Sequence, residues 1–240
     1  MSSRTPLKAA ALLWLALAQT AVAAPLAAVV ELFTSQGCSS CPPADAILAD
    51  LARRPDVVAL TFPVDYWDYL GWKDTLADPR FTKRQRGYAH VRGDRQVYTP
   101  QMVVNGTKSC IGSDRAQVDA LTVSGEALPV AVSTSETRDT VQVKIDASPD
   151  RIAVAEVWML PVARSRTVPI GRGENSGRTI SYVNVVRGMV RVGEWRGGPA
   201  SFDVPLETAR GDGDAYVVLL QTLQGIKPGV ILGAAKSPGL

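Results

Sequence analysis

Residues 29–43, VVELFTSQGCSSCPP, decide how the rest of the chain is interpreted. They begin as an apolar run typical of a buried strand, break at Gly37 and then bring Cys38 and Cys41 three positions apart. A Cys-x-x-Cys pair between a strand and a helix is how a thioredoxin-like fold presents its dithiol. The stretch therefore predicts sulfur chemistry at the end of a β-strand.

A helix is predicted directly after the pair, over residues 41–54, CPPADAILADLARR. Its prolines occupy a first turn, which tolerates them, and apolar residues recur behind them at helical spacing. We therefore expect Cys38 at the helix N-terminus, where unpaired N–H groups and the helix dipole would favour its thiolate and lower its pKa. Cys41 would lie one turn away and close a disulfide.

The first half of the chain, to residue 125, alternates strands and helices. Strands are expected over 27–33 and 57–64, helices over 41–54 and 78–91, then a hairpin over 101–110 and a last helix from 114. The order β-α-β-α-β-β-α is what a thioredoxin fold needs. In addition, Thr99-Pro100 precedes the third strand, where thioredoxin-like proteins place a cis-proline facing the dithiol.

The second half changes in character. It contains short strand signals between Gly, Pro and Asp clusters, over 129–133, 140–146, 152–161, 181–190, 200–204 and 214–223. Alternation in VQVKID and the apolar runs AVAEVWML and YVVLLQTL predict strands of a β-sandwich, while GRGENSG at 171–177 predicts a loop. The predicted fold class is α/β: a thioredoxin-like domain over residues 24–126, followed by a β-sandwich-like all-β domain over residues 127–240.

Several longer motifs make a resemblance specific. They are VELFTSQGCSSCPPAD, VDYWDYLGWKD, VYTPQMVVNG, GENSGRTISYVNVVR and the terminal GVILGAAK. Together they resemble the secreted bacterial family DUF1223 over nearly the whole mature chain. The resemblance implies a thioredoxin-like N-terminal part and a β-rich C-terminal part, and it supplies no substrate. Where that family is expected to carry His before VDYWD, this chain has Pro63.

Residues 1–23 are typical of an export signal. Arg4 and Lys8 precede a short apolar run, and Ala21-Val22-Ala23 fits a cleavage site. The apolar run is shorter than the roughly 20 residues of a membrane-spanning helix. We therefore expect an exported protein, periplasmic or secreted, with no membrane span after cleavage. Without the signal 24 basic residues face 23 acidic ones, and no basic stripe indicates nucleic acid.

Besides a redox role, the cysteine pair could form a structural disulfide or part of a metal site. A structural disulfide would close so short a loop that it would remove little unfolded-state entropy, which argues against it. A closed metal site would need further ligands, and the chain offers only His90 and Cys110 besides the pair. We expect no cofactor. In the favoured interpretation Cys38 attacks a substrate disulfide and Cys41 resolves the mixed disulfide.

Three further residues are candidates for the site. A cis Pro100 would hold the Thr99 backbone against the dithiol, so that a substrate segment could pair with it as an added strand; the alternative is a plain trans turn. Glu31 interrupts an apolar strand seven residues before Cys38. Its carboxyl would have a raised pKa and could take the proton of Cys41. The alternative is a structural role, in which it points to a polar edge or meets an arginine.

Three other features favour structural roles. The aromatic residues in VDYWDYLGW, at 64–72, more often pack domains together than bind peptides. Cys110 is interpreted as a buried free thiol, with a third redox thiol as the alternative. His90 is expected at the surface, so no Ser-His-Asp set is predicted.

The sequence thus favours a thiol–disulfide oxidoreductase. Its partners would be protein or small-molecule thiols and disulfides, together with a redox partner that recycles it. The alternatives are a dithiol module that binds or delivers a soft metal such as Cu(I) without catalysis, and a scaffold whose disulfide stays closed.

Overall fold

The computed structural model describes residues 26–123, 127–148 and 154–240. The predicted export signal at 1–23 lies outside them. None of the helices in the described ranges is long and apolar enough to cross a membrane.

The first half contains four strands, three α-helices and one short 3-10 helix among the described residues. In chain order they are β1 Ala28–Thr34, α1 Pro42–Ala52, β2 Val57–Pro63, η1 Asp68–Leu70, α2 Pro79–Arg92, β3 Gln101–Val104, β4 Lys108–Ile111 and α3 Arg115–Val123. The strands and α-helices follow the predicted order β-α-β-α-β-β-α. Asp78 caps α2 as expected, because its side chain accepts a hydrogen bond from the Arg80 N–H.

The second half is built mainly of strands. They are β5 Val132–Glu136, β6 Thr140–Ile145, β7 Ala155–Pro169, β8 Thr179–Val186, β9 Val190–Trp195, β10 Ala200–Pro205, β11 Ala215–Gln224 and β12 Lys227–Lys236, with a short helix α4 Leu206–Arg210 before β11. Two predictions were wrong here. The run 181–190 spans the end of β8 and the start of β9, and β12 was missed because Pro228, Gly229 and Gly233 interrupt its strand signal.

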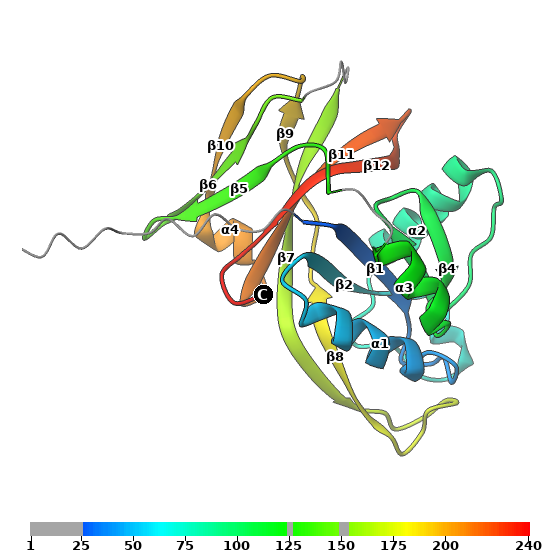
Figure 1. Ribbon diagram of the computed structural model, residues 1–240. Helices are drawn as coiled ribbons and strands as arrows, with labels where there is room; N and C mark the ends of the chain where they lie inside the picture. The colour runs from blue at the N-terminus through cyan, green and yellow to red at the C-terminus, as the bar shows by residue number, and fades with distance from the viewer. Residues whose placement is uncertain (1–25, 124–126, 149–153) are drawn as a thin grey trace, which may run out of the picture.

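One large sheet runs through both halves of the molecule (Figure 1). Its order is β12-β11-β7-β8-β2-β1-β3-β4, and β9 pairs with the other part of β7. β1 is parallel to β2 and antiparallel to β3. The chain is therefore a mixed α/β protein. The strands of the predicted C-terminal domain continue the N-terminal sheet, which differs from the separate β-sandwich that we expected.

The two halves join where β2 meets β8. Their parallel ladder has one described residue pair, Thr61 with Val185. Side chains extend it: the Thr61 hydroxyl donates to the Val183 carbonyl at 2.6 Å, and the Asn184 amide donates to the Ala59 carbonyl at 3.0 Å. Asn184 has a φ of 47°, a conformation that asparagine tolerates better than most residues. Because only one residue pair forms this ladder, the sequence pattern of the two strands does not predict that they are neighbours.

A second sheet, β10-β6-β5, packs against the β7, β11 and β12 part of the first. Val141, Val143 and Ile145 of β6 share a core there with Val157 of β7 and Val218 of β11. This stacking of two sheets is the sandwich-like feature of the second half. It stabilises strands whose other face carries polar residues.

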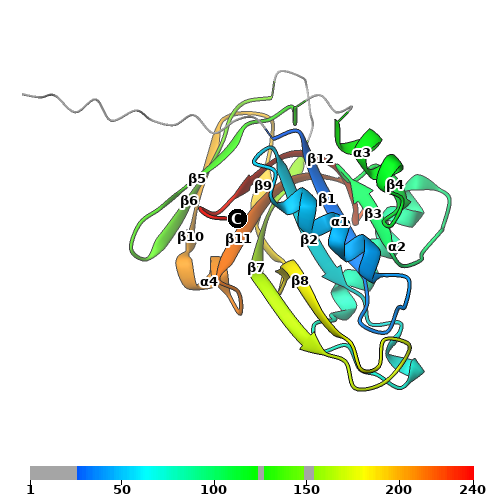
Figure 2. The same cartoon turned by 60° about the horizontal axis from the view of Figure 1, so that its bottom comes forward.

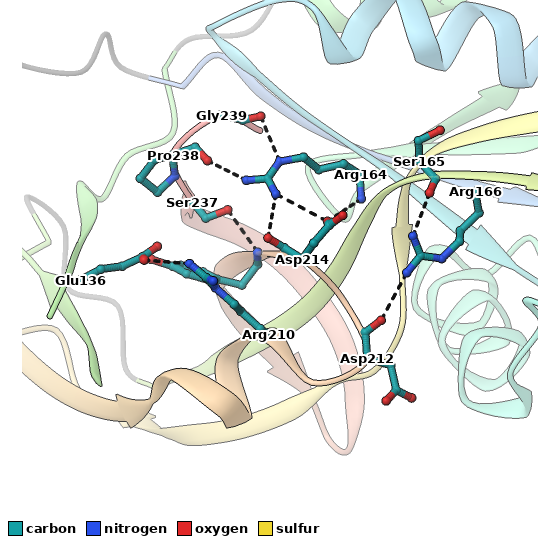
Figure 3. A network of polar contacts seen from close by, with 11 residues as sticks. Glu136, Arg164, Ser165, Arg166, Arg210, Asp212, Asp214, Ser237, Pro238 and Gly239 are labelled. Carbon is teal, nitrogen blue, oxygen red and sulfur yellow. Dashed lines mark hydrogen bonds and ion pairs between the residues drawn. The ribbon is translucent and has the colours of Figure 1, made fainter. Parts of the chain in front are cut away.

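The end of the chain is tied to β7 by one arginine (Figure 3). The Arg164 guanidinium donates to the carbonyls of Pro238 and Gly239 at 2.8 and 3.2 Å and to the Asp214 carbonyl at 2.7 Å. The backbone N–H of Arg164 also donates to the Asp214 carboxylate, at 2.9 Å. The last residues are thereby fastened beside the start of β11.

Helices cover both faces of the N-terminal part of the sheet (Figures 1 and 2). Val30 and Leu32 of β1 point to the face covered by α1, where they pack with Leu48. Val29 and Phe33 point to the opposite face and pack with Tyr88 of α2. Because successive side chains of a strand alternate, Glu31 also faces α2.

Candidate functional site

Cys38 and Cys41 form a disulfide with an S–S distance of 2.10 Å. The pair follows the C-terminal end of β1, and both residues are completely buried. The two serines between them are exposed. The peptide groups of the Cys38-x-x-Cys41 turn therefore reach the surface while the sulfur atoms do not.

The helix begins later than expected. Cys41, not Cys38, is the N-cap of α1, and Cys38 lies one turn before it in a turn closed by its N–H on the Ser35 carbonyl at 3.1 Å. Pro42 and Pro43 have no N–H, and the N–H groups of Ala44 and Asp45 both bond to the Cys41 carbonyl. The unpaired N–H groups expected to stabilise a Cys38 thiolate are therefore absent from this helix end.

The loop between β7 and β8, residues 170–178, contacts the Cys38-x-x-Cys41 turn and lies near the N-terminal end of α1 (Figures 1 and 2). The buried Asn175 amide donates to the carbonyls of Gln36 and Cys38, both at 2.9 Å. Next to it, the Glu174 carboxylate accepts the Ser39 N–H at 3.0 Å. Hydrogen bonding from the Ser39 side chain, and then from its N–H, lowers the pKa of Glu174. This loop, predicted as a loop from its glycines, is the part of the second half that contacts the Cys-x-x-Cys turn.

The aromatic segment at 64–72 forms the other wall. Trp72 donates its indole N–H to the Gln36 side chain at 2.8 Å, its ring lies against Gly171 of the β7–β8 loop, and its Cβ lies next to Gly173. A side chain at Gly171 would press on that ring, because its Cβ would come within 3.2 Å of it. Trp72 thus joins the two halves, as its structural interpretation predicted, whereas Tyr69 is exposed.

The Thr99–Pro100 peptide bond is cis. Phe33 of β1 pairs with Gln101 of β3, so Thr34 and Pro100 come next at the same edge of the sheet. This is the edge at which the chain leaves β1 toward Cys38. The cis-proline and the disulfide therefore lie at one edge, as the sequence predicted.

Glu31 lies in a buried ion pair, which is the second of the two alternatives considered for it. The Arg84 guanidinium donates to its carboxylate at 2.7 and 3.0 Å, and also to the Tyr88 hydroxyl and the Gln221 side chain at 2.6 and 2.9 Å. The side chains of Glu31 and Arg84 are both buried. The pair lies on the α2 face of the sheet, whereas Cys41 precedes α1 on the other.

A different buried acid lies beside Cys41. Asp45 is one helical turn further along α1, so its side chain and that of Cys41 lie on the same side of the helix. Both Asp45 oxygens, the Thr34 hydroxyl and the Tyr182 hydroxyl are buried without a hydrogen bond of good geometry to the described residues. Burial raises the pKa of Asp45 to about 7, against the opposing effect of the Thr34 hydroxyl.

A second carboxyl, that of Asp74, supports the turn. It accepts the N–H groups of Gln36 and Leu76, both at 2.8 Å. Burial raises the pKa of Asp74 to about 6. Burial is the main cause that raises the pKa of Tyr182, and the charges of Asp45 and Asp74 raise it further. Asp45 was missed at the sequence level because an acid in the first turn of a helix is ordinary; only its burial distinguishes it.

The remaining candidates keep structural roles. Cys110 is a free thiol buried among Met102 and the residues of α3, as predicted, and burial raises its pKa to about 11. His90 is exposed. In the ranges that the structure describes, His, Cys, Asp and Glu side chains do not gather in threes that could hold a metal ion.

The family described as "Protein of unknown function (DUF1223)" matches residues 29–221. The chain belongs to the DUF1223 family. This confirms the resemblance drawn from its motifs, and no curated protein matches the chain.

Two solved structures are similar to this DUF1223 protein. The crystal structure of protein AGR_C_4864 from Agrobacterium tumefaciens is 37% identical, with a TM-score of 0.79 over 90% of this chain and 96% of that one. HBP35 of Porphyromonas gingivalis is 12% identical, with a TM-score of 0.58 over 89% of this chain and 75% of that one, which shows a shared fold only.

Proposed function

We propose that this DUF1223 protein is an exported thiol–disulfide oxidoreductase whose N-terminal part is thioredoxin-like. The observation that carries the proposal is the Cys38–Cys41 disulfide at the same sheet edge as the cis Thr99–Pro100 bond. The order β2-β1-β3-β4 within the large sheet supports it, because β1 and β2 form a parallel pair joined by α1, and β3 and β4 form an antiparallel hairpin beside β1.

The reaction is an exchange of sulfur–sulfur bonds. When the protein acts as an oxidant, a substrate thiolate attacks Sγ of Cys38; a mixed disulfide forms, the Cys38–Cys41 bond breaks and its electron pair leaves on Cys41. A second substrate thiolate then attacks the mixed disulfide and releases Cys38. The substrate gains a disulfide, and the protein gains two electrons that a redox partner must remove. Reduction of a substrate disulfide follows the same steps in reverse.

Asp45 is the group placed to exchange a proton with Cys41. A carboxyl with a pKa of about 7 is partly protonated at neutral pH, so it can protonate a departing Cys41 thiolate or accept the thiol proton in the reverse step. Glu31 is not placed for this task, because Arg84 holds it on the opposite face of the sheet.

The β7–β8 loop must move before exchange takes place. A nucleophile has to approach the sulfur atom along the S–S axis, and both sulfur-bearing residues are buried under a loop held by Asn175 and Glu174. Opening breaks the contacts of these two side chains with the Cys-x-x-Cys turn. A segment that displaced the loop could pair with the backbone at Thr99, as the sequence suggested.

The test is the reduction potential of the Cys38–Cys41 pair in the mature protein, equilibrated with glutathione buffers and read by thiol trapping. A value between about −120 and about −270 mV supports exchange with substrates, the upper end as an oxidant and the lower as a reductant. A bond that stays closed far below about −300 mV would make the disulfide structural and overturn the proposal. Tight Cu(I) binding by the reduced protein, with no disulfide exchange, would favour metal delivery instead.

A further inference from the structure

A second site lies on the α2 face of the molecule, away from the disulfide. A half-open cavity of about 680 Å³ is lined by α2 on one side and by β7, Met189 and the β11–β12 hairpin on the other. This volume is in the range of small-molecule pockets. The name α2 pocket is used below for this cavity, whose key lining residues are Lys83, Arg86, Trp158, Met189, Leu223 and Ile226.

The helix wall of the α2 pocket is cationic. α2 contains Arg80, Lys83, Arg84, Arg86 and Arg92, and no acidic residue. Residues 80, 83, 87 and 90 follow one face of a helix, and each of them lines the cavity. Among the described residues, Lys83 and Arg86 have no ion-pair partner, while Arg80 is held by Asp78 at 2.5 Å. Two exposed cations at this wall are therefore available to an anion.

The opposite wall is mainly apolar, with the cation Lys227 at its edge. Trp158 and Met189 are half-buried, and Leu223 and Ile226 are exposed, Ile226 with 88% of its surface at the hairpin tip. Isolated exposed apolar residues are common, but here they gather on one side of a cavity. The one acidic residue that lines the pocket, Glu156, is engaged by Arg191 at 2.6 Å.

The floor is polar and densely hydrogen-bonded. Arg84 and Gln221 line the pocket while both are almost fully buried in the Glu31–Tyr88 network. At Gly87 a Cβ atom would come within 2.7 Å of Pro228, so α2 lies directly on β12 at this point. The two walls are thus held at a set distance by packing.

We propose that the α2 pocket binds an amphipathic carboxylate, a molecule with one anionic head and an apolar body. The head would lie between Lys83 and Arg86, and the body would cover Trp158, Met189 and the hairpin tip. Charge complementarity selects this class, because the unpaired cations and the apolar wall face each other across the cavity. The inference is independent of the proposed thiol chemistry.

The test uses dansyl-undecanoic acid as the probe, with binding followed by dansyl fluorescence. The wild-type protein is expected to bind it with a Kd in the micromolar range. The double variant Lys83→Glu, Arg86→Glu should bind at least tenfold more weakly, since two charge-assisted contacts become repulsive. The matched double variant Lys108→Glu, Lys144→Glu, which reverses two exposed lysines outside the pocket, should bind like the wild type.

Two further measurements keep the proposal falsifiable. Met189→Trp should weaken binding of the acid and of its uncharged amide alike, because it fills the apolar half, whereas the Lys83 and Arg86 reversals should affect mainly the acid. Absence of binding below millimolar probe, an equal loss in the matched lysine variant, or a dimer in solution that excludes the probe would each overturn the proposal.

Discussion

Two buried carboxyl groups on β1 and α1 have opposite environments. Glu31 is fully buried and bonded to the Arg84 guanidinium, with Tyr88 and Gln221 completing the network. Asp45 is nearly as buried, and the groups that act on its charge are the Thr34 hydroxyl and another acid, Asp74. A carboxylate paired with a guanidinium holds structure, whereas burial without such a partner raises the pKa of a carboxyl, which can then exchange its proton near neutral pH. Burial alone therefore does not identify a functional acid. The presence or absence of a cationic partner distinguishes the two roles.

The largest effect should follow from removing the cation that pairs with Glu31. Arg84→Met leaves a buried carboxylate without its counter-charge, so we expect the free energy of unfolding to fall by about 3–5 kcal/mol. Urea unfolding monitored by tryptophan fluorescence measures it. The double variant Glu31→Gln, Arg84→Met removes both charges and should recover part of the loss. A change below about 1 kcal/mol in Arg84→Met would mean that the pair contributes little.

The next prediction concerns pH and Asp45. Its folded-state pKa of about 7 lies above the ordinary value of 3.8, so the folded protein holds a proton that the unfolded chain loses. This contribution to stability is fully present below pH 3.8 and is lost as the pH rises to about 7. Asp45→Asn should therefore match the wild type near pH 4 and exceed it at pH 8 by on the order of 3–4 kcal/mol.

Unfolding measured across that pH range for both proteins gives the difference directly. Asp212→Asn, which changes an exposed carboxyl, is the matched control and should show no pH-dependent gain. If Asp45→Asn were destabilising by the same amount at every pH, its carboxyl would not carry a raised pKa.

The two acids should also differ in exchange kinetics. The reduced protein should react with Ellman's reagent in two phases, attack by Cys38 and then displacement by Cys41. Asp45→Asn should slow the second phase at least about tenfold and remove its inflection near neutral pH, because the proton acceptor is lost. Glu31→Gln should change this phase by less than about twofold. Equal slowing in both variants would indicate a general structural effect and remove the distinction.

The smallest effect expected is at the loop above the disulfide. Asn175→Ala removes two hydrogen bonds to the Gln36 and Cys38 carbonyls, which together stabilise the closed loop by about 1 kcal/mol or more. Reduction of the disulfide by dithiothreitol should become about fivefold faster in a quenched thiol-trapping assay. Ser176→Ala, whose side chain bonds only within the loop to Gly171, should reduce at the wild-type rate.

Much of the first half was predictable because its signals are local. Asp78 and Pro79 mark the start of α2, the break at Gly37 separates β1 from the cysteines, and Thr99-Pro100 precedes β3 as expected. The partners of Glu31 and Asp45 were not predictable. They come from segments 53 residues away for Arg84, and from β8 for Tyr182, so no spacing along the chain records them.

The basic wall of the α2 pocket shows the same limit. The sequence contains no continuous basic stripe, because the cations of α2, at 80, 83, 84, 86 and 92, are interspersed with uncharged residues. The helix brings residues 80, 83, 87 and 90 to one face, and the β11–β12 hairpin, more than 120 residues later, supplies the apolar wall.

The sequence by itself determined the order of strands and helices in the first half, the cysteine pair at the end of β1 and the family, since these depend on residues close together in the chain. The tertiary structure alone decided that β8 extends the N-terminal sheet, that Asn175 bonds to the Gln36 and Cys38 carbonyls and that Glu31 pairs with Arg84. Those outcomes depend on which distant surfaces bury each other, and burial is a property of the packed chain rather than of any one segment.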